Sequence, residues 1–415
     1  MRILHISDTH LGYGTVGRSH LPERERDFYD ALDEVIQIAI EEEVNAVLHG
    51  GDMFHRSTPE PQTYVRAIEA LKKLREKGIR FFVVAGNHDT PRTYRHSPLR
   101  VLEKIGLLEI LSLKEPGKAV IRSPQGFDVE IYGYSKEASE KFFREKIPVD
   151  KGNKDVIRIA LVHALTCEPM EIYLGWSPEV CEEREAPRLA SSINKDVFSY
   201  IALGDLHIYW EGRVGNAVAV YPGSTEALDR SEAFDKDGKF IERRAYIVDI
   251  DRDGVYPRYR RLGNTRPWIL VSGADYRDVI RKLQTLNLGS YRKSPILTIK
   301  LGREPSPSEN EVLNRELERL VSEKKILALD DVLKPGGDER LMLYDVKSPG
   351  EAEEIPTLES VLKEVFMDEK ISKVIFEYIE NRLSNDDLLK MLREDRDLLE
   401  KLNQILARML SRGSR

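Results

Sequence analysis

Five short segments of the chain carry side chains that can bind metal ions. They are Asp8-Thr9-His10, Gly51-Asp52, Gly86-Asn87-His88-Asp89, His163 and Gly204-Asp205-Leu206-His207. In an Asp-x-His pair at the end of a strand, the two side chains point to the same side and can reach one ion. A carboxylate such as that of Asp52 has two oxygens and can bridge two cations, which a neutral imidazole cannot do. Oxygen and nitrogen ligands without thiolates favour manganese, iron or zinc over an iron–sulfur cluster or a structural zinc site.

Each segment taken alone is unspecific. An isolated Asp-x-His is more often a surface turn, and an isolated histidine such as His163 is more often a buried imidazole with hydrogen-bond partners. The four residues from Gly86 to Asp89 are also compatible with an Asn-rich turn. Five such segments in this order, each after a predicted strand, are hard to obtain by chance. Together they indicate a two-metal site.

The elements that must position these segments alternate between short β-branched runs and helical patterns over residues 1–262. Buried strands are predicted at Arg2–Ile6, Ala46–His49, Phe81–Ala85, Ile157–Val162 and Tyr200–Leu203. Helices are predicted near Glu25–Glu42 and Pro61–Lys77, and further strands at Val129–Tyr134, Ala217–Tyr221, Ala245–Ile250 and Tyr256–Leu262. So many strands suggest two sheets packed face to face with helices outside. In α/β proteins, ligands bind at the carboxyl ends of strands, where these segments lie.

The pattern changes from about Asn264. Strands at Trp268–Val271 and Ile296–Leu301 and helices near Asp275–Leu286 and Glu309–Ser322 predict a small α+β domain. Two Pro- and Gly-containing segments, 334–337 and 348–350, predict a linker. Apolar faces after Pro356 predict a helical tail. The expected domains are therefore 1–262, 263–345 and 346–415.

The composition of the 415 residues, 41% hydrophobic and 33% charged, is that of a globular protein of two or three domains. No apolar run approaches the roughly 18 residues that cross a bilayer, and the first residues lack the apolar core of a signal peptide. We therefore expect a cytoplasmic protein. The net charge of −7 neither supports nor excludes DNA binding, because a carboxylate site is acidic until its metals load. Cys167 and Cys181, outside any CxxC motif, are expected to be incidental thiols.

The ordered pattern D-x-H, GD, GNHD, H and G-[HD]-x-H resembles that of the calcineurin-like metallophosphoesterase superfamily. Within it, ISDTHLGYG, GGDMFHRSTP, VVAGNHD and ALGDLH are similar to motifs of the archaeal-type SbcD family of double-strand-break repair (meiotic-recombination) nucleases. The resemblance covers the first 230 residues, and the later domains match only in order, size and helical character. It implies a four-layer αββα sandwich of two mixed sheets, a small α+β capping domain and a C-terminal helical tail.

The resemblance also implies two Mn2+ ions per subunit, although other divalent ions are possible. It assigns the first ion to Asp8, His10, Asp52 and His207. It assigns the second ion to Asp52, Asn87, His163 and Asp205. His88, positioned by Asp89, would protonate or stabilise the leaving oxygen, and His55 would help to place the phosphate.

Asp205 departs from the family pattern, which usually reads Gly-His-x-His. Asp8, Asp52 and Asp205 contribute −3 against the +4 of two divalent ions, which leaves +1, whereas a histidine at 205 would leave +2. We hypothesise that the extra carboxylate tightens metal binding and makes the bridging water less acidic. An unchanged acidic limb in the pH–rate profile of Asp205→His would refute this.

Residues in or just after these loops mix positive charge with an aromatic ring, as phosphate-tracking grooves do. They are Tyr13, Arg18, His20, Arg24, Arg92, Arg95, His96 and Arg100. Solvated loop charge is an equal alternative. The DNA contacts that we select from this set are Tyr13, Arg18, Arg92 and Arg95.

The resemblance implies a homodimer, paired through the helices near 61–77 and 99–108. It also implies that the tail helices bind a coiled-coil, ABC-type repair ATPase of the structural-maintenance-of-chromosomes kind, which gives a heterotetramer. Simple core packing of both sets of helices is the alternative. No membrane partner is expected.

The expected function is that of a Mn-dependent, nucleoid-associated DNA nuclease in a double-strand-break processing complex. The resemblance implies 3′–5′ exonuclease activity on double strands and endonuclease activity on single strands. A phosphoesterase of small substrates is one alternative, disfavoured by the cap-like domain and the tail. A DNA-tethering scaffold with a decayed site is another, disfavoured by the complete ligand set.

Overall fold

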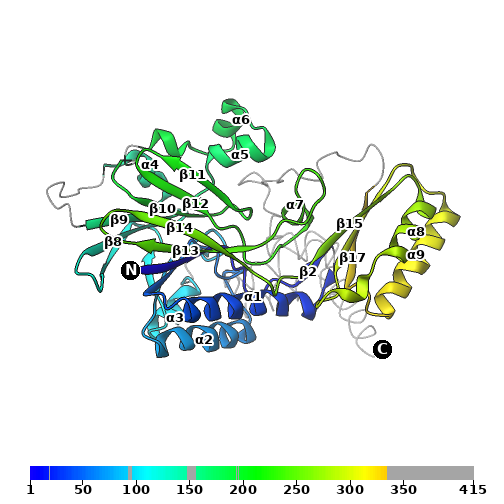
Figure 1. Ribbon diagram of the computed structural model, residues 1–415, viewed down its shortest axis with the longest axis horizontal. Coiled ribbons are helices and arrows are strands. Elements are labelled where there is room, and N and C mark those ends of the chain that lie inside the picture. The colour runs from blue at the N-terminus through cyan, green and yellow to red at the C-terminus, as the bar shows by residue number, and fades with distance from the viewer. Residues whose placement is uncertain (18, 92–95, 147–155, 193, 195, 334–415) are drawn as a thin grey trace, which may run out of the picture. The chain divides into compact units, whose positions relative to one another are not determined.

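The computed structural model describes residues 1–17, 19–91, 96–146, 156–192, 194 and 196–333 (Figure 1). Three of the expected DNA contacts, Arg18, Arg92 and Arg95, lie outside these residues, as do the predicted linker and helical tail. Within the described ranges, no helix is both long and apolar enough to cross a membrane.

Two six-stranded mixed sheets form the larger part of the fold. The first sheet has the order β14 (Val255–Arg261), β13 (Arg244–Ile250), β1 (Arg2–Ile6), β4 (Ala46–His49), β5 (Arg80–Val84) and β6 (Glu109–Ser112). The second has the order β11 (Trp210–Val214), β12 (Ala217–Tyr221), β10 (Tyr200–Gly204), β9 (Val156–His163), β8 (Asp128–Tyr134) and β7 (Gly117–Arg122). In the first, β1, β4, β5 and β6 run parallel, and in the second β12, β10, β9 and β8 do. The two mixed sheets are thereby confirmed.

The sheets pack face to face, and helices cover their outer faces (Figure 1). One apolar core contains inward side chains of both sheets, such as Leu48 and Ile159. A second core joins the other face of the first sheet to α1 (Pro22–Glu41) and α2 (Pro61–Glu76), whose Val35 and Leu71 are fully buried. The other helices are short: α3 (Leu99–Lys104), α4 (Ser139–Arg144), α5 (Cys167–Leu174), α6 (Pro178–Glu183), η1 (Leu189–Ser191) and α7 (Arg230–Ala233). A hairpin of β2 (Thr15–Val16) and β3 (Ser19–His20) precedes α1.

A third, parallel sheet follows the sandwich in the chain. It consists of β15 (Trp268–Gly273), β16 (Ile296–Leu301) and β17 (Ala328–Leu333), with α8 (Tyr276–Thr285), α9 (Pro307–Ser322) and η2 (Leu288–Ser290) between them. Its own apolar core includes Val279, Ile299 and Leu317. The predicted strands and helices of this segment are confirmed, and β17 is an addition.

A buried charge cluster corrects the expectation that Arg24 faces solvent near DNA. The Arg24 side chain on α1 is fully buried and lies 2.9 Å from Asp27 and 3.5 Å from Glu226. Arg266, just before β15, also reaches Asp27, at 2.5 Å, across 239 residues of sequence. Helical periodicity places Arg24 and Asp27 one turn apart, and the cluster forms because each buried charge needs a partner.

A disulfide joins Cys167 and Cys181, which we had expected to be incidental thiols. The two residues are 14 positions apart, and both are buried where α5 and α6 pack together. The sequence separation of the two cysteines does not predict the disulfide, because the pairing depends on the turn between two short helices.

Candidate metal centre

Loops from both sheets meet at the carboxyl ends of the parallel strands. Asp8 follows β1, Asp52 follows β4 and Asn87 follows β5, while His163 ends β9 and Asp205 follows β10. The backbone N–H groups of Asp8 and His10 donate to the carbonyls of Gly51 and Asp52, both at 3.0 Å, which ties the first two loops together. The predicted placement at strand ends is confirmed.

Unusual backbone geometry turns the side chains into this space. Asp8, His10, Asp52 and Asp205 have positive φ angles of 51°, 40°, 53° and 93°. Such angles are uncommon outside glycine and persist only when the surroundings enforce them. Gly204 allows the two sheets to touch here, because a Cβ at this position would lie 2.2 Å from the carbonyl oxygen of Gly50.

One half of the site consists of Asp8, His10 and His207. Their donor atoms lie within 4.8 Å of one another. The two Nε2 atoms of His10 and His207 are 3.1 Å apart, and Nε2 of His207 lies 3.7 Å from Oδ1 of Asp8. Atoms that bind one ion at about 2.1 Å are roughly 3.0–3.5 Å from each other, so the His10–His207 spacing fits a shared cation and the Asp8–His207 spacing lies slightly above this range.

The other half of the site surrounds Nε2 of His163. Nδ1 of His163 donates to the carbonyl of Gly50 at 2.7 Å, which leaves the lone pair on Nε2. Around Nε2 lie Oδ1 of Asn87 at 3.1 Å, Oδ2 of Asp52 at 3.6 Å and Oδ1 of Asp205 at 3.6 Å. A cation between the Nε2 lone pair and these oxygens would satisfy all of them at once, so this half also fits a metal ion.

Asp52 lies between the two halves. Its Oδ2 is 3.9 Å from Nε2 of His10 and 3.6 Å from Nε2 of His163, and its Oδ1 accepts the backbone N–H of His88 at 2.8 Å. Burial, together with the carboxylates of Asp89 and Asp8, raises the pKa of Asp52 well above its ordinary value. Burial raises the pKa of Asp8 to about 6. These carboxylates crowd together at an energetic cost that bound cations relieve.

Glu232 and Lys136 complete the charge balance, and the sequence did not reveal either. Nδ1 of His207 donates to Glu232 Oε1 at 2.5 Å, and Lys136 Nζ donates to Asp205 Oδ2 at 2.5 Å. Glu232 lies on α7 and Lys136 in the loop after β8, outside any motif that we had selected. A carboxylate on the second nitrogen of a metal-binding histidine is common, so a search for buried acids near His207 would have found Glu232.

When no metal is bound, a proton on His207 supplies the positive charge in the first half of the site. Burial alone would lower the pKa of His207, but the carboxylates of Glu232 and Asp8 outweigh it and raise that pKa to about 10. Burial lowers the pKa of His10 well below its usual range. A protonated His207 can therefore donate from Nδ1 to Glu232 and from Nε2 to neutral His10.

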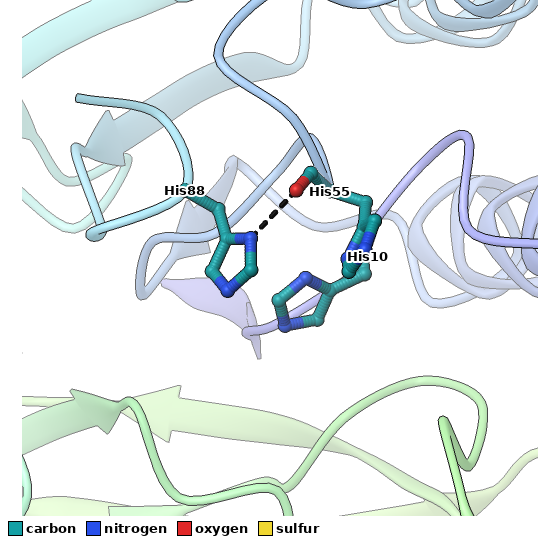
Figure 2. A group of neighbouring side chains, drawn as sticks. All are labelled: His10, His55 and His88. Carbon is teal, nitrogen blue, oxygen red and sulfur yellow. Dashed lines mark hydrogen bonds between the residues drawn. The ribbon is translucent and has the colours of Figure 1, made fainter. Parts of the chain in front are cut away.

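His55 and His88 gather around His10 of the candidate metal site, as Figure 2 shows. Nδ1 of His88 donates to the carbonyl of His55 at 2.6 Å, and the two rings stack with centroids 5.0 Å apart. The hydrogen bonds of Asp89, which we expected to position His88, go to backbone groups rather than to the His88 ring. Asp89 is fully buried and accepts the backbone N–H groups of Met53, Phe54 and Gly86, so it shapes the loops on which the metal-binding residues lie.

Among the expected accessory residues, Tyr13 lies close to these histidines. Its ring packs edge-on against His55, with centroids 4.7 Å apart, and against Phe28 at 5.2 Å. Arg100 is exposed and pairs with Glu103 at 2.6 Å, as a solvated helix charge does.

Comparison with known proteins agrees with this geometry. The family model for the calcineurin-like phosphoesterases matches residues 1–209. The DNA double-strand break repair protein Mre11 of Thermoplasma acidophilum is 31% identical over 309 residues, which cover 72% of this chain and 76% of that protein. Mre11 of Saccharolobus solfataricus is 28% identical over 431 residues, which cover 99% of this chain and 98% of that protein.

Solved structures align more weakly. A dimetal phosphatase from Danio rerio aligns at 12% identity with a TM-score of 0.32, over 62% of this chain and 98% of that one, which is too low to carry an argument. The match over half of the chain and the identity to curated relatives carry the assignment. The chain belongs to the calcineurin-like phosphoesterase family and, within it, to the archaeal Mre11 proteins of DNA double-strand break repair.

Proposed function

We propose that this protein is a two-metal DNA nuclease of double-strand-break processing that works best with Mn2+. One observation carries the proposal: loops from two different sheets bring the donor atoms of seven residues together. The family match and the names of the relatives supply the reaction class and the DNA substrate.

The ligand assignment follows the two halves of the site. Asp8, His10, Asp52 and His207 would hold one ion, and Asp52, Asn87, His163 and Asp205 the other. When bound, two divalent ions at such a site acidify a water molecule and stabilise charge on the phosphate oxygens. Donors of carboxylate, amide and imidazole type suit Mn2+, and exclude a thiolate-rich site.

His88 is the residue that we propose for the leaving oxygen. Its Nδ1–H is held by the His55 carbonyl, so Nε2 is the atom that can carry a proton to the departing sugar oxygen. Burial lowers the pKa of His88, so only rings that carry a proton on both Nδ1 and Nε2 can protonate the leaving oxygen. The His55 ring, stacked on that of His88, would help to place the phosphate.

Larger assemblies and domain roles are part of the same proposal. We propose the domains 1–262 (nuclease), 263–345 (DNA capping) and 346–415 (linker and partner-binding tail). The tail would bind a coiled-coil ABC-type ATPase, and α2 with α3 would pair two nuclease domains. Val65 on α2 and Val101 on α3 are 46% and 45% exposed in the single chain, which supports such a contact.

The test is cleavage of end-labelled duplex DNA by purified protein with Mn2+ or with EDTA, beside His88→Gln and Asp52→Asn. We expect Mn2+-dependent cleavage, loss of turnover with retained metal in His88→Gln, and loss of metal in Asp52→Asn. A small chromogenic phosphodiester is assayed in parallel. Cleavage of this compound but not of DNA would favour a small-substrate phosphoesterase, and no Mn2+-stimulated cleavage of either would contradict the proposal.

A further inference from the structure

Lys136 lies at the edge of the candidate metal centre, where neither the motifs nor the comparisons assign a residue. It follows β8, whose parallel neighbour β9 ends in His163, and β10, next to β9, leads to Asp205. Three adjacent strands of the second sheet thus deliver Lys136, His163 and Asp205 to one place. The loop of Lys136 is fixed, because its backbone N–H donates to the carbonyl of Ala85 at 3.0 Å and its carbonyl accepts from the Ser139 hydroxyl at 2.9 Å.

The two carboxylate oxygens of Asp205 face different neighbours. Oδ2 accepts the Lys136 ammonium at 2.5 Å, whereas Oδ1 faces Nε2 of His163 at 3.6 Å. The backbone N–H of Asp205 is held by Oδ2 of Asp8 at 3.2 Å. Asp205 therefore offers a single oxygen to the site, and the second is occupied by a cation of the protein itself.

The charge of the site changes accordingly. Apart from Glu232, which lies behind His207, Asp8, Asp52 and Asp205 sum to −3, and Lys136 brings this sum to −2. A neutral imidazole at position 205 without Lys136 would give the same −2 and the same single donor atom. Our count from the sequence omitted this lysine.

We propose that Lys136 is a positioning residue that makes Asp205 a one-atom, charge-neutralised metal donor and thereby sets the metal affinity and the acidity of the bound water. This inference rests on the proposed two-metal function. A plain surface ion pair, such as Lys141 of α4 with exposed Glu115, contributes little to any site. The Lys136 pair differs because the Asp205 side chain is only 18% exposed and points its other oxygen at His163.

The test is a double-mutant cycle of Lys136→Met and Asp205→His, measured by calorimetric titration of the metal-free protein with Mn2+ and by the pH–rate profile. Lys136→Met exposes an uncompensated carboxylate. We expect Mn2+ to bind roughly tenfold more tightly and the acidic limb to move up by about one pH unit. Asp205→His leaves the Lys136 ammonium without its carboxylate. Mn2+ should then bind more weakly, and the acidic limb should move to lower pH. The double variant returns close to the wild type.

Two further variants control the cycle. Lys136→Arg keeps the charge and should bind Mn2+ like the wild type, and Lys141→Met removes a lysine of the same region and should change nothing. Weaker Mn2+ binding in both single variants, with no recovery in the double variant, would overturn the inference while leaving the two-metal function intact. Failure of the wild type itself to bind Mn2+ would instead refute the proposed function, and this inference with it.

Discussion

Gly86→Ala should disable the metal centre through one methyl group. A Cβ at this position would lie 2.0 Å from Oδ1 of Asp52 and 2.6 Å from its backbone nitrogen. Contacts under 3.0 Å essentially never occur, so the carboxylate oxygen must move by at least 1.0 Å, the difference between 3.0 and 2.0 Å. Rotation of the carboxylate cannot relieve the contact with the backbone nitrogen. The loop of Asp52 must therefore shift, and the hydrogen bond from the His88 N–H is lost with it.

A displacement of about 1 Å in a catalytic constellation costs roughly 100-fold in rate. We therefore expect Gly86→Ala to lose at least about 100-fold in Mn2+-dependent DNA cleavage and to bind Mn2+ more weakly in calorimetry. Gly289→Ala is the matched control, because a Cβ there meets nothing within 4 Å. It should stay within about 0.5 kcal/mol of wild-type stability and keep full activity. Wild-type metal affinity and cleavage in Gly86→Ala would refute the assignment of Asp52 to the centre of the site.

Three further perturbations test other parts of the structure. His207 has a raised pKa of about 10 without metal, so its contribution to the stability of metal-free protein is present below its ordinary pKa of 6.5 and is lost as pH rises through about 10. Metal binding near pH 7.5 must release that proton, which metal titrations in buffers of different ionisation enthalpy should detect. The number of protons released should fall in Glu232→Gln, and an unchanged number would contradict the ion pair between His207 and Glu232. Reduction of the Cys167–Cys181 disulfide should lower the free energy of unfolding by up to about 3 kcal/mol in denaturant titrations, and free thiols in unreduced, alkylated protein would refute the disulfide itself. Arg24→Met removes the ion-pair partner of buried Glu226, whereas Asp27 keeps Arg266, and should destabilise the fold by about 3–5 kcal/mol; an unchanged melting temperature would show that the cluster is dispensable.

Most of the sandwich could be predicted because its strands are short apolar runs at the spacing of β-α-β units. Arg2–Ile6, Ala46–His49 and Ala217–Tyr221 have the predicted bounds, and other ends differ by one residue or a few. The strands β7 (Gly117–Arg122) and β11 (Trp210–Val214) were missed because they lie at sheet edges, where exposed residues interrupt the apolar pattern.

The candidate metal ligands could be selected from the sequence because each lies at or just after the end of a predicted strand. Their supporting residues could not, because the contacts join positions far apart in sequence. Lys136 and Asp205 are 69 residues apart, and the pair depends on the order of β8, β9 and β10 in the sheet. The hydrogen bonds of Asp89 could not be predicted for a related reason: the resemblance implied a role beside His88, whereas the carboxylate accepts the backbone N–H groups of Met53 and Phe54, more than 30 positions away in the sequence.

The central claim is that loops from two sheets hold a pair of metal ions with Asp52 between them. Anomalous diffraction at the manganese absorption edge, from crystals grown with Mn2+, tests it directly. We predict two peaks per chain, one beside His10 and His207 and one beside His163 and Asp205, both within bonding distance of Asp52. A single peak remote from Asp52, or no peak in this cluster at millimolar Mn2+, would contradict the account.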